Sequence, residues 1–154
     1  MTLWEWSTRA WATPGVEVAC LDLQDAQGQN IPLLLWAAWA ASTGRAPSDD
    51  DIEAACDTAR VWQETVVAPL RGVRRALKTR IPDLDDDDRE AVRGQVTAVE
   101  LDAERRLLTA LERHAPPPSG PTGAVLPALI AVSRQWSGVT PRTALTLLAE
   151  RLPA

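Results

Sequence analysis

Hydrophobic residues recur along the chain with the three- and four-residue spacing of helices, and no stretch alternates with the two-residue period of a β-strand. Turn residues interrupt this pattern at several points, so we expect separate helices. Two short helices precede Gly28, and further helices are expected over about 31–43, 49–80, 85–113, 124–136 and 141–152. The chain is therefore expected to be all-α.

Capping residues mark several helix starts. Thr2 and Glu5 have the spacing of a capping box, and a second box begins at Ser48. Thr13 is expected to cap the second helix, with Pro14 at its first position.

The stretch 31–43, which follows Asn30 as its cap and precedes Gly44, carries no charged residue and is apolar on all sides. A helix of this kind is buried all round. We therefore expect it to be the central element of the fold.

Two long helices, 49–80 with a kink or break at Pro69 and 85–113, are joined by a turn at 81–84. The second helix carries a narrow apolar seam of nearly heptad spacing, formed by Val92, Val96, Val99, Ala103, Leu107 and Ala110. We expect the two helices to pair antiparallel along this seam. The same seam would also suit a homodimer.

A stretch rich in proline and glycine divides the chain at 114–123. We expect a helical bundle domain over 1–113, a linker over 114–123 and a C-terminal helical hairpin over 124–154. The predicted architecture is an irregular helical bundle with a central buried helix, a long antiparallel helix pair and this hairpin.

The composition is that of a globular protein, with 45% hydrophobic and 24% charged residues. The net charge of -5 argues against nucleic-acid binding, which needs a basic surface. The most apolar stretch, 31–41, is shorter than the roughly 20 residues that span a bilayer, and no signal-peptide pattern is present. Cys20 and Cys56 lie in separate amphipathic patterns, which favours buried free thiols. We expect a cytoplasmic protein without membrane insertion.

Five cations and no acid lie within 69–82 of this acidic chain. Four of them share one side of the predicted helix and form what we call the basic stripe: Arg71, Arg74, Arg75 and Lys78. Like charges repel one another, so an anion is expected nearby. It is either internal, from Asp85–Asp88 or the acids at 49–64, or it belongs to an acidic protein partner that docks on the stripe.

Two further places are candidates for binding. Gln24, Asp25 and Asn30 lie beside the apolar helix 31–43 and form either a ligand pocket or a solvated turn. Trp136, near the end of a short helix after the linker, is the tryptophan that we expect to be most exposed, and it is a candidate anchor for a partner. The other tryptophans on apolar faces are expected to be core residues.

Catalytic chemistry has little support. His114 is the only histidine, whereas a catalytic triad or a zinc site needs further ligands or partners. The aspartates from Asp83 onward lack the glycine and glutamate of a calcium loop, and they are expected to stabilise the start of the next helix. Glu100 and Glu104 are interpreted as ion-pair partners of the arginines that follow them at 105 and 106. We expect no catalytic residue, no cofactor and no metal.

Three stretches, "LWEWSTRAW" at 3–11, "PGVEVACLDLQDAQGQNIPLLLWAAWAASTGR" at 14–45 and "WQETVVAPLRGVRRALK" at 62–78, resemble a proteobacterial family of small all-helical proteins classed as a domain of unknown function. The resemblance covers about residues 1–112. It implies an all-α fold in a bacterial cytoplasm and brings no activity, cofactor or catalytic residue. It draws attention to Gln24, Asp25, Gly28, Asn30 and the basic stripe. The family pattern favours Phe or Tyr where this chain has Trp6, Trp11 and Trp36.

These features favour a non-catalytic interaction protein, an adaptor or regulator, that docks an acidic protein partner on the basic stripe, with Trp136 as a second contact. The alternative is a binder of a small anionic ligand, such as a nucleotide or a phosphorylated metabolite, between the stripe and residues 24–30.

Overall fold

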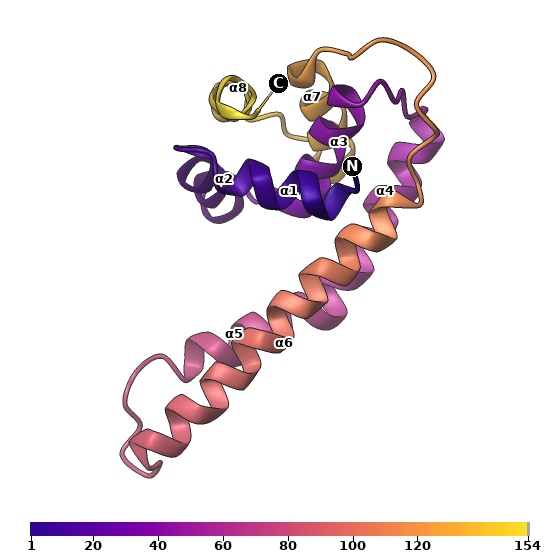
Figure 1. Cartoon of the computed structure of the whole chain (residues 1–154). Coiled ribbons are helices and arrows are strands. Elements are labelled where there is room, and N and C mark those ends of the chain that lie inside the picture. The colour runs from indigo at the N-terminus through magenta and orange to yellow at the C-terminus, as the bar shows by residue number, and fades with distance from the viewer. Residues whose placement is uncertain (154) are drawn as a thin grey trace.

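The computed structural model describes residues 1–153, and over these residues the chain is entirely helices and their connections (Figure 1). This confirms the all-α prediction. The elements, in order, are α1 (Leu3–Trp11), α2 (Val16–Asp25), α3 (Ile31–Ser42), α4 (Asp49–Trp62), the π-helical turn η1 (Gln63–Val67), α5 (Ala68–Ala76), α6 (Asp86–Glu112), α7 (Val125–Ser137) and α8 (Arg142–Arg151).

The molecule has three parts. The head comprises α1–α3, α7 and α8, and the root is the antiparallel contact of α4 with the second half of α6. The arm, residues 63–100, comprises η1, α5, a turn and the first half of α6, and it extends away from the head to a tip at 77–88 (Figure 1). The long antiparallel helix pair predicted from the sequence is this root and arm.

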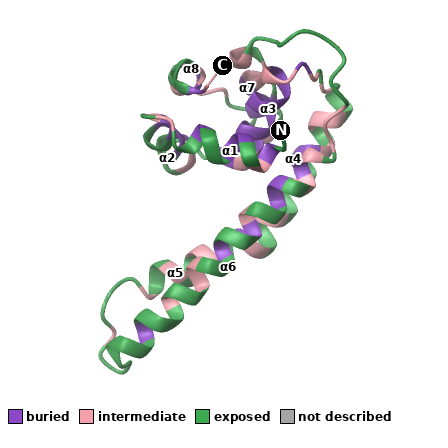
Figure 2. Ribbon diagram, viewed as in Figure 1, coloured by how far each residue is buried: buried purple, intermediate pink, exposed green. Residues whose placement is uncertain are grey.

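Helix α3 is the centre of the head, as its uniform apolarity predicts. Ten of its twelve residues are buried, and it packs against α1, α4, α6 and α7. Asn30 caps it by accepting a hydrogen bond from the Leu33 amide at 3.0 Å. Figure 2 shows burial concentrated in the head and root, while the arm is mostly exposed.

The C-terminal hairpin shares the core of the head. Leu129 and Val132 of α7 and Leu145 and Leu148 of α8 are buried in the same cluster as α3. The segment 114–123 is held along the head, because the Ser119 amide donates to the carbonyl of Gly44 at 3.0 Å. The segment predicted as a linker at 114–123 is therefore a largely exposed connection between helices that share one core.

Two helix starts and one helix end differ from the sequence prediction. Helix α2 begins after Gly15, which is its N-cap at a φ of 84°, so Thr13 does not cap it and Pro14 lies before its first turn. The helix expected from about 141 begins at Arg142, and Pro141 is its N-cap without a side-chain hydrogen bond. The helix predicted over 49–80 ends at Ala76 and is interrupted by η1, one turn before Pro69. Because proline lacks an amide hydrogen, a wider turn at this point accommodates the missing bond.

The apolar seam predicted for α6 is only partly correct. Ala103 and Leu107 are buried, but Val92 and Val99 are 49% and 53% exposed. Within the arm, the buried residues of α6 are instead charged, and one of them is Glu100, whose carboxylate faces α5. None of the helices in residues 1–153 is both long and apolar enough to cross a membrane.

Candidate functional site at the corner of head and arm

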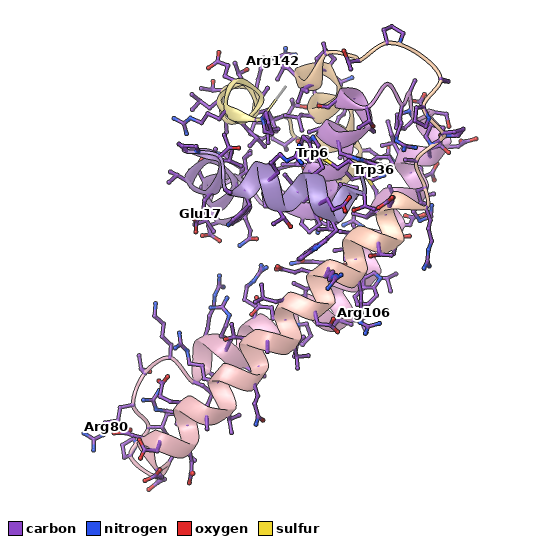
Figure 3. The ribbon with its side chains drawn as sticks, viewed as in Figure 1. Trp6, Glu17, Trp36, Arg80, Arg106 and Arg142 are labelled. Atoms are coloured by element: carbon purple, nitrogen blue, oxygen red, sulfur yellow. The ribbon has the colours of Figure 1, made fainter. Side chains whose placement is uncertain are left out.

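A groove opens where the arm leaves the head. Its volume is about 360 Å³, and it lies between α1, the end of α2, the start of α3 and the middle of α6. We call it the corner groove, and it is lined by Trp4, Ser7, Thr8, Trp11, Gln24, Ile31, Pro32, Leu35, Leu101, Glu104 and Leu108. Figure 3 shows the corner between the head, which holds Trp6 and Trp36, and the arm, which ends near Arg80.

The walls of the groove are apolar and reach solvent. Trp4 and Trp11 are two turns apart on α1, so both side chains lie on one face. Trp11 is 39% exposed, and Leu101 on the facing helix is 60% exposed. The guanidinium of Arg105 lies 5.0 Å from the centre of the Trp4 ring, a cation–π contact at the edge of the groove.

Two polar groups of the groove are poorly satisfied. The Ser7 side chain is buried, with 5% of the residue exposed, yet its Oγ has no hydrogen-bond partner among residues 1–153. Glu104 has one ion pair among residues 1–153, with Arg71, at 3.6 Å between Oε1 and Nη2. A buried hydroxyl and a carboxylate with free acceptor positions are groups that a bound molecule can satisfy.

The basic stripe meets its anions inside the arm. Arg74 Nε donates to Glu100 Oε2 at 2.6 Å, and Arg71 Nε lies 3.4 Å from Glu100 Oε1. The side chain of Glu100 is only 9% exposed. Two of the four cations are thus neutralised by α6, and their partners are Glu100 and Glu104.

The aspartates at the tip serve other groups. Asp85 caps α6 by accepting a hydrogen bond from the Asp88 amide at 3.0 Å, as the sequence predicts. Asp86 forms ion pairs with Arg80 and Arg89. The interpretation of Glu100 and Glu104 as partners of their neighbours at 105 and 106 was wrong, because both carboxylates point to α5 and Arg106 pairs with Asp102.

The surroundings of this network shift two pKa values. Burial raises the pKa of Glu104, and the nearby charge of Glu100 raises it further, while Arg71 and Arg74 act in the opposite direction. The hydrogen bond to Glu100 raises the pKa of Arg74. Glu104, the one acid among the residues that line the groove, therefore accepts a proton more readily than an ordinary glutamate does.

The other two cations of the basic stripe remain exposed. Arg75 is 61% exposed and lies 4.0 Å from the equally exposed Asp25, at the end of α2. Lys78 is exposed and makes no ion pair within residues 1–153. These two side chains are the part of the stripe that an external anion can reach.

The predicted pocket at Gln24, Asp25 and Asn30 is small. Asn30 is used to cap α3, and the Gln24 side-chain amide donates to the Asp25 carboxylate at 3.3 Å. The space that Gln24 and Asn30 share with Arg71 has a volume of about 20 Å³. Gln24 also lines the corner groove, so the structure brings it together with Glu104.

The prediction that Trp136 is the most exposed tryptophan was wrong, because Trp136 is half-buried whereas Trp11, expected in the core, is 39% exposed. Trp136 instead holds α7 to the rest of the head. Its indole Nε1 donates to the Gly28 carbonyl at 3.1 Å, and the Arg60 guanidinium lies 4.3 Å from its ring centre. Its side chain contacts Arg60 of α4 and the loop before α3, and no hydrogen bond or cation–π contact within residues 1–153 joins it to the basic stripe. The site residues predicted from sequence therefore divide between two places.

Residues 1–153 hold no group of three His, Cys, Asp or Glu side chains arranged to bind a metal. His114 lies at the end of α6, where its Nε2 and the Thr58 hydroxyl are 2.8 Å apart. It is not among the residues that line the corner groove.

Sequence reasoning missed Ser7 and the partner carboxylates of the stripe. For the carboxylates a signal existed, because Glu100 and Glu104 are one turn apart and so match the spacing of Arg71 and Arg74 on a facing helix. For Ser7 there was none, since a serine on an amphipathic helix is unremarkable until its neighbours are placed.

Comparison with known proteins gives one result. Residues 2–111 match the model of a family described as protein of unknown function (DUF2390). No curated protein and no solved structure matches the chain.

Proposed function

The chain belongs to the DUF2390 family, and from that premise we propose that it is a non-catalytic interaction protein, an adaptor or regulator, that works in the cytoplasm. It holds an acidic segment of a partner protein in the corner groove. The observation that carries this proposal is the groove itself, which is apolar and open to solvent. The basic stripe reaches it through Arg71, which pairs with the groove residue Glu104, and through Arg75, which pairs with Asp25 next to the groove residue Gln24.

The apolar walls supply the anchor. Exposed large apolar side chains that converge in one concave place mark binding sites more often than scattered ones do. Trp11 and Leu101 lie on opposite walls and leave room for one or two partner side chains. The unpartnered Ser7 hydroxyl adds a polar contact that an incoming backbone or side-chain group can complete.

The charges of the basic stripe beside the groove favour an acidic partner. The four cations of the stripe face three carboxylates, those of Asp25, Glu100 and Glu104, so one positive charge is left over. The exposed groups among them are Arg75 and Lys78. Charges at the edge of an interface mainly steer association and weaken with salt.

Two observations support the remaining parts of the proposal. Cys20 and Cys56 are both buried free thiols, which suits the reducing cytoplasm. The groove contains a carboxylate and a hydroxyl but no histidine or thiol beside them, which suits binding more than catalysis.

The alternative prediction, a small anionic ligand between the stripe and residues 24–30, has less support. The space beside Arg71 has a volume of about 20 Å³, enough for one water molecule, whereas small-ligand pockets hold about 300 Å³ or more. A nucleotide or phosphorylated metabolite would bind there only if α5 moved away from α6. We therefore place the acidic segment first.

Site-specific photocrosslinking tests the proposal. A benzophenone amino acid replaces Leu101 in the groove or, as a control, Leu147 on α8, which is 43% exposed and outside the groove. Irradiation in a bacterial lysate at low salt, followed by mass spectrometry, should give a discrete adduct from position 101 only. The adduct should disappear in the folded double variant Arg75→Glu, Lys78→Glu. Adducts that are the same from both positions, or none from position 101, contradict the proposal.

A further inference from the structure

We propose that the arm pairs with the arm of a second copy of this chain, in an antiparallel homodimer whose acidic tip lies against Arg106 and Arg113 at the root of its partner. The surface involved is the outer flank of the arm, formed by Val73, Val92, Val96 and Val99. It faces away from the side on which Arg71 and Glu104 meet. The proposal is therefore independent of the corner groove.

The arm lacks a core of its own. No residue of α5 is buried, and within 63–100 only Val67, Arg89 and Glu100 are buried. Two of those three are charged. An amphipathic helix is stable when its apolar stripe is buried against another element, so a two-helix arm of this kind needs a cover.

The uncovered apolar residues lie on one flank. Val92, Val96 and Val99 follow each other at spacings of four and three on α6, so they share one face of the helix. Val92 and Val99 are about half exposed, and Val73 on α5 is 46% exposed. On α5, helical periodicity places Val73 and Arg71 on opposite sides of the line that faces α6.

The charges along this flank are self-complementary. Asp85 and Asp88 lie at its tip end, and Arg106 and Arg113 lie at its root end. Asp85 and Arg113 are each 14 residues from Val99, or about 21 Å along the helix. When two copies of α6 pair antiparallel about a two-fold axis at Val99, Asp85 of each copy is opposite Arg113 of the other, and Asp88 falls between Arg106 and Arg113. A single two-fold axis at Val99 therefore sets opposite charges against each other at both ends of the paired α6 helices.

The root carries a hollow that fits the tip. This hollow has a volume of about 480 Å³ and is lined by Trp62, Asp102, Arg105, Arg106, Thr109, Ala110 and Arg113. Its one acid, Asp102, is already paired with Arg106 at 2.8 Å, and Arg113 has no ion pair within residues 1–153. The tip presents Leu84, which is 45% exposed, beside its aspartates. Leu84 against Trp62 gives the antiparallel pair an apolar contact at each end.

Sedimentation velocity across concentrations up to about 100 µM tests the dimer. The wild-type chain should sediment as a dimer, and Val99→Arg should be a folded monomer, because it places two like charges at the two-fold axis. Val139→Arg, at a position that is 66% exposed in the α7–α8 connection, is the matched control and should stay dimeric. A wild-type monomer throughout this range overturns the proposal.

A charge exchange tests the direction of pairing. Asp85→Arg and Arg113→Glu should each weaken the dimer alone, because each sets like charges against each other. An equimolar mixture of the two should form a heterodimer that is stronger than either variant alone, since the exchanged residues 85 and 113 then meet with opposite charges at one end and the wild-type pair meets at the other. A dimer that is unaffected by either change, or a mixture no stronger than its components, overturns the antiparallel arrangement. Val99→Cys should in addition form an intermolecular disulfide on oxidation, and failure to do so in a dimeric sample also overturns it.

Discussion

Glu100 Oε2 accepts a hydrogen bond from Arg74 Nε at 2.6 Å, across the two helices of the arm. The carboxylate is 9% exposed and also lies 3.4 Å from Arg71 Nε, so one buried acid is shared by two arginines. It is the only buried residue of α6 between Glu90 and Leu101. The arm is therefore joined at this level by charge, in a place where most helix pairs are joined by apolar contacts.

Glu100→Gln should destabilise the protein by about 2–4 kcal/mol, because it leaves two poorly solvated guanidinium groups without their counter-charge. Asp102→Asn is the matched control. It removes the exposed pair with Arg106 on the same helix and should cost no more than about 0.5 kcal/mol. Urea unfolding followed by circular dichroism measures both. Equal losses of unfolding free energy in the two variants would contradict the larger stabilising contribution expected of the Glu100 network.

Glu104→Gln should become relatively more stabilising as pH rises. Burial and Glu100 raise the pKa of Glu104 above its ordinary value of 4.5, so the folded chain binds a proton that the unfolded chain has already released. The wild type consequently loses stability as pH rises through the interval between 4.5 and the raised value, and the amide variant does not. The measurement is the difference in unfolding free energy between variant and wild type from about pH 4 to pH 7. A difference that is constant or falls over this range contradicts the prediction.

Gly44→Ala should be much more damaging than Gly28→Ala. Both glycines have positive φ, 70° and 64°, so each substitution carries the left-handed backbone cost of about 1–2 kcal/mol. At Gly28 a Cβ meets no atom within 4 Å, whereas at Gly44 it would overlap the carbonyl oxygen of Gly120. We expect Gly44→Ala to cost about 2 kcal/mol more than Gly28→Ala. The measurement is thermal unfolding together with limited proteolysis of 114–123, which should be cut faster in the first variant alone.

The two cysteines should be unreactive in the folded protein. Burial raises the pKa of Cys20 to about 12 and that of Cys56 to about 11, where Asp57 adds to the shift and Arg60 opposes it. Because the thiolate is the reactive form, a disulfide reagent at about pH 8 should label neither thiol until denaturant is added, when both should react. Val139→Cys, at a position that is 66% exposed and outside the flank of the arm, supplies an exposed thiol for comparison and should react at once. Rapid labelling of the native wild type would contradict the burial.

Local features of the fold were predictable, because their causes are close in sequence. The capping box of Thr2 and Glu5 is present with both hydrogen bonds, and the helix predicted from Asp85 begins there. The burial of α3 followed from its lack of any charge. The lack of charge also implied that every side of α3 must be covered, and α7 covers one of these sides. The packing of α7 on α3 was not expected, because the proline-rich composition of 114–123 suggested a separate hairpin.

The partners of the basic stripe were not predictable with the same ease. Arg74 and Glu100 are 26 residues apart, and which side chains meet depends on the register between two helices. The π-helical turn at Gln63–Val67 sets that register, because its wider turn changes the direction of every side chain that follows on α5. No short-range pattern marks such a turn, apart from the nearby Pro69.

Helix α6 continues without a break from the tip to the core of the head. Its 27 residues make a rod of about 40 Å, with Leu107, Leu108 and Leu111 fixed at one end and the tip aspartates free at the other. It is therefore a lever whose short end is set in the head. A displacement of the tip would therefore tilt α6 where it packs against α1 and α3 beside the corner groove.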